Sequence, residues 1–124
     1  MANILIIDDD KTMTELLKTL LKMEGHTPTA VNDSTKAIDV AATVNPDLIT
    51  LDLMMPGLSG FDLCELLRHD PKFTNVPIII VSARDDAESK QKALRAGAQA
   101  YLTKPFDADE LMHKINQLTR VQGL

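Results

Sequence analysis

The sequence predicts an α/β fold: a doubly wound, five-stranded parallel sheet with five helices, built as one domain. Three observations predict it. At 124 residues with a single cysteine, the chain is long enough to bury a core without disulfides. Short apolar runs rich in β-branched residues alternate with stretches of helical periodicity along the whole length. The runs are continuously apolar rather than alternating, which is typical of parallel strands covered by helices on both faces.

The predicted strands are the five apolar runs. They occupy residues 4–7, 27–31, 48–51, 78–81 and 100–102. Pro28 lies within the second run, and because proline lacks the N–H that a sheet ladder needs, we expect this strand at an edge. Connections between parallel strands are right-handed, so the intervening helices cover both faces of the sheet.

The predicted helices lie between and after these runs. Apolar side chains at positions 13, 16, 17, 20 and 21 follow helical spacing, and Gly25 is placed to end that first helix. The second helix begins after a cap at Asp33 or Ser34, and the third ends before Pro71. The fourth spans about residues 85–96 and carries few apolar side chains. The fifth shows helical spacing at Leu111, Ile115 and Leu118.

Composition bounds the function classes. The chain carries 18 acidic residues against 13 lysines and arginines, a formal net charge of −5, and only 3% aromatic residues. Such a surface does not favour direct binding of nucleic acid. No apolar run approaches the roughly 18 residues of a membrane span, and the N-terminus lacks the basic start and apolar stretch of a signal peptide. We expect a cytoplasmic protein without membrane contact.

Three consecutive carboxylates, Asp8, Asp9 and Asp10, follow the first predicted strand. Asp10 has the position of a helix N-cap, and acidic residues in a first helical turn are stabilised by the helix dipole. Capping accounts for one or two carboxylates. Three adjacent ones repel each other, and a bound cation would relieve that repulsion. From this cluster alone, capping and cation binding are equally good explanations.

Single polar residues mark the ends of three further strands. Asp52 follows the third run, Ser82 ends the fourth and Lys104 follows the fifth. Each alone has an ordinary explanation as a turn former, a helix cap or a surface charge. Ligands of doubly wound sheets bind at the carboxyl ends of the strands. The first and third strands of such a sheet are neighbours, so Asp52 is expected beside Asp8 and Asp9. Carboxylates that converge in this way need Mg²⁺ or Mn²⁺.

This combination of side chains describes phosphoryl transfer to a carboxylate. Asp52 would be the nucleophile and would become an aspartyl phosphate. A divalent cation on Asp8 or Asp9 would neutralise the phosphoryl oxygens, while Ser82 would donate a hydrogen bond and Lys104 would supply a positive charge. No general base is needed, because an aspartate is already ionised near neutral pH.

Four segments together resemble the receiver domain of bacterial response regulators, the two-component signalling family. They are the acid-pair segment 6–10, the phosphoacceptor segment 51–57, the switch-hydroxyl segment 81–83 and the lysine segment 101–106. The resemblance covers essentially the whole chain. It implies a flavodoxin-like strand order, 2-1-3-4-5. The receiver domain would span residues 1–121, and residues 122–124 would be a C-terminal tail or the start of a linker.

The resemblance implies a role for each site residue. Asp52 would accept a phosphoryl group from the phosphohistidine of a sensor histidine kinase or phosphotransfer protein. That carboxylate, Asp8, Asp9 and the backbone carbonyl of Met54 would hold Mg²⁺. The peptide bond that corresponds to Lys104–Pro105 is cis in similar proteins, so the resemblance implies a cis bond here. The residues that would contact the phosphoryl oxygens are Ser82 and Lys104.

The resemblance also implies an output mechanism. In the family, the switch hydroxyl, here Ser82, moves toward the phosphoryl group while the ring of Tyr101 turns inward. This would reshape the face made by the fourth helix, the fifth strand and the fifth helix, and so control an output domain or a downstream protein. Members that dimerise through this face usually carry an acidic pair where this chain has Gln99 and Ala100. We therefore expect a monomer or a phosphorylation-dependent dimer, and that particular pairing is not favoured.

Two positions tune the lifetime of the phosphoryl group in similar proteins, one two residues after the acceptor and one two residues after the switch hydroxyl. Here they are Met54 and Arg84, which are bulky and carry no acid or amide to orient an attacking water. We predict slow self-dephosphorylation. Beyond its own phosphoryl transfer, no turnover of an independent substrate is expected.

Two other functions are compatible with parts of the pattern. A degenerate receiver would act as a constitutive protein-interaction module, although its acids, Ser82 and Lys104 are intact here. An aspartyl-phosphate hydrolase on a related sheet usually needs a second aspartate where this chain has Met54. Glycine motifs that bind nucleotides are absent. No output domain is recognisable after the fifth predicted helix, and the chain could be a stand-alone regulator or part of a longer one.

Overall fold

The computed structural model describes the backbone of residues 2–122 and the side chains of residues 2–119. Within these residues, five parallel strands form one sheet in the order β2-β1-β3-β4-β5, so the predicted fold class and strand order are confirmed. The sheet connects segments far apart in the sequence, because β1 pairs with both β2 and β3. The strands are β1 (Asn3–Ile7), β2 (Thr27–Val31), β3 (Leu48–Leu51), β4 (Ile78–Ser82) and β5 (Ala100–Thr103).

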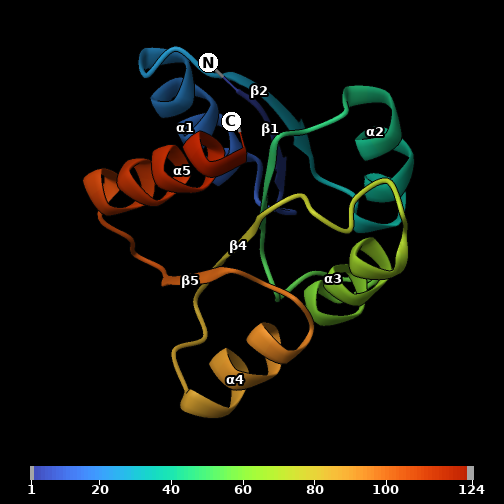
Figure 1. Cartoon of the computed structure of the whole chain (residues 1–124). Coiled ribbons are helices and arrows are strands. Elements are labelled where there is room, and N and C mark those ends of the chain that lie inside the picture. The colour runs from blue at the N-terminus through green and yellow to red at the C-terminus, as the bar shows by residue number, and fades with distance from the viewer. Residues whose placement is uncertain (1, 123–124) are drawn as a thin grey trace.

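Helices alternate with the strands and cover both faces of the sheet (Figure 1). Helices α1 and α5 lie on one side of the sheet, whereas α2 and α3 lie on the other, with α4 near β5 (Figure 1). A short 3-10 helix, η1 (Ser34–Lys36), leads into α2. The α-helices are α1 (Lys11–Met23), α2 (Ala37–Val44), α3 (Gly60–His69), α4 (Ala87–Arg95) and α5 (Ala108–Gln122).

Continuous apolar strands give the sheet two cores, one on each face. In β1, Leu5 and Ile7 pack toward α2, α3 and α4, whereas Ile4 and Ile6 pack toward α1 and α5. All four side chains are at most 1% exposed. Successive strand residues point to opposite faces, so only a run that is apolar at every position can fill both cores.

Pro28 lies in the edge strand β2, as predicted. The N–H of Thr27 donates to the Ala2 carbonyl (2.8 Å), and the N–H of Asp8 donates to the Val31 carbonyl (3.1 Å). Residues 27 and 31 therefore face β1, and the nitrogen of Pro28 is directed to the open edge, where no ladder bond is lost.

Helix ends agree with the predicted caps in most places. Asp10 caps α1, because its Oδ1 accepts from the N–H groups of Thr12 (2.9 Å) and Met13 (3.2 Å). At the other end Gly25 takes a φ of 85°, and the N–H of His26 donates to the Leu21 carbonyl, a Schellman cap.

Two helix starts differ from the prediction. Asp33 caps η1 rather than an α-helix, and α2 begins only at Ala37. Helix α4 begins at Ala87, later than predicted, because Asp86 accepts from the Ser89 N–H (2.9 Å) and fixes the first turn there. No helix among the described residues is long and apolar enough to cross a membrane. Of the predicted tail at 122–124, Gln122 is the last residue of α5, and residues 123 and 124 lie outside the described part of the chain.

Candidate functional site

The carboxyl ends of β1 and β3 bring three carboxylates together. The strands are neighbours with Ile7 opposite Leu51, so Asp8, Asp9 and Asp52 emerge side by side. One carboxylate oxygen from each lies within 4.8 Å of the other two. Asp8 and Asp52 are buried, at 3% and 6% exposure, whereas Asp9 is exposed. Three oxygen donors at this spacing fit a hard divalent cation.

The two explanations for the acid run apply to different residues. Asp10 alone caps α1. The Asp8 carboxylate instead turns toward the site, with its Oδ1 accepting from the Asp10 N–H (3.0 Å). Capping therefore leaves Asp8 and Asp9 available for a cation.

Lys104 reaches the carboxylates from the end of β5. Its Nζ lies 2.8 Å from Asp8 Oδ2 and 3.4 Å from Asp52 Oδ2, and its side chain is 16% exposed. The Lys104 N–H donates to the Ser82 carbonyl (2.8 Å), which fixes the backbone of this segment beside β4. The Lys104–Pro105 peptide bond is cis. Lys104 is thus the counter-ion of both buried carboxylates.

Burial and charge act on these groups in opposite directions. Burial raises the pKa of Asp52, and the Asp8 charge raises it further, whereas the hydrogen bond from the Met54 N–H and the Lys104 ammonium lower it. Burial favours neutral Lys104, but the hydrogen bond and charge of Asp8 outweigh this and raise the pKa of the ammonium. The site therefore holds more negative charge than its own lysine neutralises.

Ser82 ends β4 at the same edge of the sheet and is fully buried. It does not cap the next helix, since Asp86 does so. Its Oγ accepts from the Arg84 N–H at 3.3 Å. Because β4 lies between β3 and β5, the serine is placed between the strands that carry Asp52 and Lys104.

Arg84, Met54 and Tyr101 lie together beside the carboxylates. The Met54 side chain is 53% exposed, and the Arg84 Nη1 lies 4.0 Å from its Sδ. The Tyr101 hydroxyl donates to the Arg84 carbonyl at 2.6 Å. Burial raises the pKa of this phenol. These contacts join the loop after Asp52, the loop after β4 and the strand β5.

A model of the response regulator receiver domain family matches residues 4–116 of this chain. The chain belongs to that family. The curated relatives include the DNA-binding dual master transcriptional regulator RpaA of Synechocystis, 38% identical over 97% of this chain and 50% of the relative. They also include the DNA-binding response regulator MtrA of Mycolicibacterium paratuberculosis, 37% identical over 94% of this chain and 51% of the relative. The chain spans about half the length of these relatives.

Solved receiver domains share the whole fold. The receiver domain of Francisella response regulator 1452 has a TM-score of 0.90 and 38% identity, and the match covers 98% of this chain and 99% of that one. The BeF3-activated N-terminal receiver domain of Klebsiella pneumoniae RstA has a TM-score of 0.89 and 26% identity, and the match covers 95% and 98%. The chain is therefore a receiver domain of the two-component signalling family.

Sequence reasoning missed three residues that shape the site of this receiver domain. Gly60 has no feature in the sequence that marks it, but a Cβ there would meet the Asp52 carbonyl oxygen and lie 2.6 Å from the Leu53 Cα. Asn32 donates to the Asp8 carbonyl oxygen (2.8 Å) and so fixes the end of β1. Ser34 reaches the loop after Asp52. No local sequence pattern could have found these contacts, because each joins segments at least seven residues apart.

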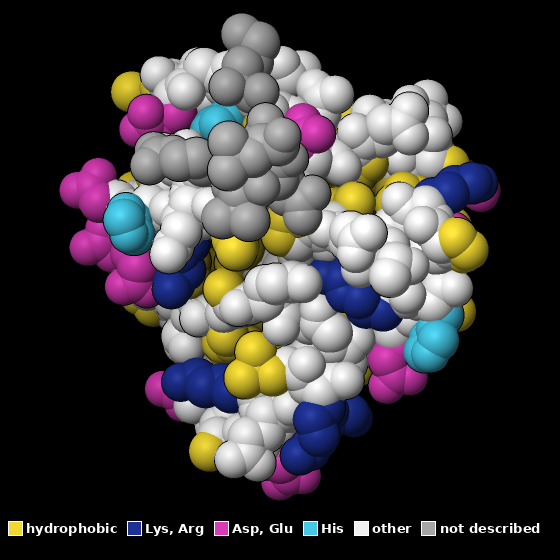
Figure 2. All heavy atoms as spheres, viewed as in Figure 1, with side chains coloured by type: hydrophobic (Ala, Val, Ile, Leu, Met, Phe, Trp, Pro, Cys, Tyr) yellow, Lys and Arg dark blue, Asp and Glu magenta, His cyan; other side chains and the backbone are white. Residues whose placement is uncertain are grey.

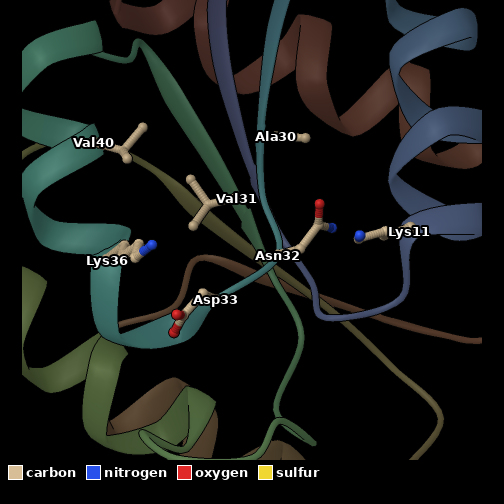
Figure 3. Close-up of a pocket in the computed structure, with 7 residues that line it drawn as sticks. All are labelled: Lys11, Ala30, Val31, Asn32, Asp33, Lys36 and Val40. Atoms are coloured by element: carbon tan, nitrogen blue, oxygen red, sulfur yellow. The ribbon is translucent and has the colours of Figure 1, made fainter.

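A shallow hollow at the open edge of β2 is separate from the carboxylates. Its volume is about 450 Å³, and none of the three acids lines it. Figure 3 shows Lys11 approaching from α1 and Lys36 from η1, with Val31 and Val40 forming an apolar wall. The hollow borders η1, since Asp33 and Lys36 line it.

Two other buried residues with chemically reactive side chains have structural roles. Cys64 is buried in the α3 core, and burial raises the pKa of its thiol to about 11, so it is an inert thiol rather than a nucleophile. The buried His26 is held by the Ala2 N–H on Nδ1 (3.1 Å), and its Nε2 lies 3.1 Å from Asn116 Oδ1.

Proposed function

We propose that this receiver domain is a phosphorylation-dependent switch that accepts a phosphoryl group on Asp52 from the phosphohistidine of a sensor histidine kinase or phosphotransfer protein. One observation carries the proposal: Asp8, Asp9 and Asp52 converge within 4.8 Å, with Lys104 as the counter-ion of the two buried acids. A helix cap or a surface charge does not require this convergence.

The donor set fits Mg²⁺, with Mn²⁺ as an alternative. Carboxylate oxygens of Asp8, Asp9 and Asp52 are the hard ligands that these ions prefer, and the Met54 backbone carbonyl would complete the protein ligands. When bound, the cation would neutralise the phosphoryl oxygens during transfer.

The chain's own residues perform the transfer. A carboxylate oxygen of Asp52 attacks phosphorus, the new O–P bond forms as the P–N bond breaks, and the electron pair of that bond leaves on the kinase imidazole. The hydrogen bond from the Met54 N–H to Asp52 Oδ1 (3.2 Å) holds the nucleophile in one orientation. Lys104 then pairs with the phosphoryl oxygens, for which its position between Asp8 and Asp52 prepares it.

A hydrogen-bonded chain connects this site to the face formed by α4, β5 and α5. Ser82 Oγ now accepts from the Arg84 N–H, while the Arg84 carbonyl accepts from the Tyr101 hydroxyl. If the Ser82 side chain rotates toward the phosphoryl group, its Oγ would move away from the Arg84 N–H, and the Arg84 backbone would be free to shift together with its contact to Tyr101. Phosphorylation would thereby favour one of two states of this face.

The same face is where we expect the output domain or downstream partner to dock. Strand β5 lies between α4 and α5 (Figure 1). Basic side chains gather over α4, and acidic ones over the start of α5 (Figure 2). The relatives named above are DNA-binding regulators of about twice the length of this chain. We therefore propose a DNA-binding output domain as the partner of this face. The net charge of −5 does not favour direct binding of nucleic acid by the receiver itself, and we place the protein in the cytoplasm.

Dimerisation through this face by the acidic-pair arrangement is not favoured. Gln99 takes the place of one acid, and its Oε1 accepts from Arg68 Nη2 (2.7 Å) and from the Ile78 N–H (2.8 Å) within the same chain. The side chain is therefore engaged inside the domain rather than offered to a second copy.

Slow self-dephosphorylation follows from the side chains over Asp52. Met54 and Arg84 contact each other and offer no acid or amide to orient a water. The degenerate-receiver and hydrolase alternatives gain no support, since every acid, hydroxyl and ammonium is present and Met54 occupies the place of a second aspartate.

The test is incubation with a small phosphodonor, acetyl phosphate, and Mg²⁺, followed by intact mass measurement. We expect a single phosphoryl adduct on the wild-type protein. The adduct should not form when EDTA is added before the incubation, and it should be absent from Asp52→Asn. Asp39→Asn, which removes an exposed acid of α2, is the matched control and should be phosphorylated normally. Absence of the adduct in the folded wild-type protein would support the degenerate receiver instead.

A further inference from the structure

Ser34 is a buried serine whose hydroxyl is used by another segment of the chain. It lies on η1 and is 3% exposed. Its Oγ donates to the Pro56 carbonyl (3.1 Å) and accepts from the Leu58 N–H (3.2 Å). The hydroxyl thus holds two backbone groups that lie 22 and 24 residues further along the chain.

The segment that Ser34 holds is the phosphoacceptor loop, residues 53–59, which begins directly after Asp52. At its start the Met54 N–H donates to Asp52 Oδ1 (3.2 Å), and at its end the Gly60 N–H donates to the Leu53 carbonyl (3.2 Å). The Ser34 contacts fix the middle of the loop, between these two points. They therefore limit how the Met54–Met55 backbone can lie.

The turn of the loop at Gly57 lies next to η1. Gly57 has a φ of 80°, and a Cβ there would lie 3.6 Å from Ser34 Oγ and 3.5 Å from Thr35 Cγ2. A side chain at Gly57 would therefore contact the 3-10 helix, to which the loop is already hydrogen-bonded.

The support under Ser34 is itself well fixed. Asp33 Oδ1 accepts from the Thr35 N–H (3.0 Å) and the Thr35 hydroxyl (2.6 Å), and the Lys36 N–H donates to the Asp33 carbonyl (3.1 Å). Figure 3 shows Asp33 and Lys36 on this turn, at the end of β2. A short turn tied at both ends can act as a fixed support for a neighbouring loop.

We propose that Ser34 is a positioning residue for metal binding: its hydroxyl holds the phosphoacceptor loop so that the Met54 carbonyl faces the carboxylates of Asp8, Asp9 and Asp52. This rests on the proposed function, in which that carbonyl is a Mg²⁺ ligand. Groups that orient metal ligands without touching the metal typically change metal affinity by about 10- to 100-fold when removed.

Ser34→Ala removes both hydrogen bonds and adds no bulk. We expect the Mg²⁺ dissociation constant to rise by about tenfold, measured by titrating MgCl₂ and following backbone amide shifts by NMR, with no phosphodonor present. At saturating Mg²⁺ the phosphorylation rate with acetyl phosphate should return to within about twofold of wild type, because the hydroxyl does not touch the reacting atoms.

Ser89→Ala is the matched control. Ser89 is also a buried serine, 4% exposed, and its Oγ donates to Asp86 Oδ1 (2.9 Å) at the start of α4, not to the loop after Asp52. Its Mg²⁺ affinity should stay within about twofold of wild type. Thermal unfolding without Mg²⁺ checks that both variants are folded. If Ser34→Ala is not folded, Ser34→Cys repeats the test, because cysteine has nearly the same volume as serine but is a weak hydrogen-bond donor.

Unchanged Mg²⁺ affinity in folded Ser34→Ala overturns the inference, as does an equal loss in Ser89→Ala. Failure of the proposed function gives a different result, because it appears in the wild-type protein itself, as no phosphoryl adduct with acetyl phosphate or no saturable Mg²⁺ binding. Failure of this inference appears only in the comparison of the two serine variants with wild type.

Discussion

The ammonium nitrogen of Lys104 lies 2.8 Å from Oδ2 of Asp8, although β3 and β4 separate the strands that lead to these residues. The lysine side chain crosses the carboxyl edge of the sheet and passes Asp52 at 3.4 Å on the way. Without a cation, this contact is what offsets the repulsion between two buried carboxylates. It also places a positive charge where phosphoryl oxygens would arrive.

Replacing Lys104 should therefore destabilise the metal-free protein. In Lys104→Met two buried carboxylates lose their counter-ion, and we expect a loss of about 3 kcal/mol in the free energy of unfolding, measured by urea denaturation in EDTA. Added Mg²⁺ should recover a larger share of stability in this variant than in wild type. Lys18→Met, which breaks an exposed pair with Glu15 at 3.7 Å, should cost less than about 0.5 kcal/mol. Equal losses in the two variants would show that Lys104 is a surface charge.

Asp52 should make stability depend on pH in a defined direction. Burial and the Asp8 charge raise its pKa in the folded state above the 3.8 of an unperturbed carboxyl. Its contribution to stability is therefore fully present below pH 3.8 and is lost as the pH rises through the raised value.

Asp52→Asn removes this dependence. Without Mg²⁺, its stability relative to wild type should grow as the pH rises from about 3.5 and then level off, by about 1.4 kcal/mol for each unit by which the folded-state pKa is raised. Urea denaturation of both proteins across this range measures the difference. A difference that shrinks with rising pH would mean that Lys104 and the Met54 hydrogen bond outweigh burial.

Gly60 should be required at the start of α3. In Gly60→Ala the new Cβ would meet the Asp52 carbonyl oxygen and lie 2.9 Å from the Asp52 carbonyl carbon, so the backbone at Asp52 must shift. We expect a loss of about 2 kcal/mol in stability and a slower reaction with acetyl phosphate.

Gly25→Ala separates this effect from ordinary glycine strain. Gly25 has a φ of 85° and no atom within 4 Å of an added Cβ, so its replacement should cost about 1 kcal/mol and leave phosphorylation unchanged. A Gly60→Ala protein with wild-type stability and rate would contradict the close approach of these two backbone segments.

The lifetime of the phosphoryl group should be set by Met54 and Arg84. Met54→Asn combined with Arg84→Glu places an amide and an acid where the two side chains now contact, and should speed phosphate loss by about tenfold or more, equivalent to about 1.4 kcal/mol in the barrier. The decay of the phosphorylated mass after removal of the donor measures this. Met23→Asn, at a methionine 77% exposed on α1, is the control. A decay rate equal to wild type in the double variant would remove these residues from the mechanism.

The fold and the main site residues could be predicted because their signals are local. Each strand is a continuous apolar run, and each functional side chain directly follows or ends such a run, so the parallel arrangement alone brings Asp8, Asp52, Ser82 and Lys104 to one edge. The sequence could not decide between capping and cation binding for the acid run. That choice depends on which carboxylate turns back onto the α1 N–H groups, and only Asp10 does.

Contacts made by loops could not be predicted. In the sequence nothing marks Gly60, and Ser34 is only a candidate helix cap, because their roles depend on the path that residues 53–59 take between β3 and α3. The start of α2 was misplaced for a related reason. Asp33 caps the 3-10 turn that supports this loop, so the α-helix itself begins only at Ala37.

The central claim is that Asp52 carries the phosphoryl group, and mapping the modified residue tests it most directly. Protein treated with acetyl phosphate and Mg²⁺ is reduced with borohydride, which converts an aspartyl phosphate to homoserine, and is then digested and sequenced by mass spectrometry. The account predicts homoserine at position 52, dependent on Mg²⁺, with Asp8 and Asp9 unmodified. Homoserine at position 8 or 9, or an adduct on a histidine in place of position 52, would contradict it.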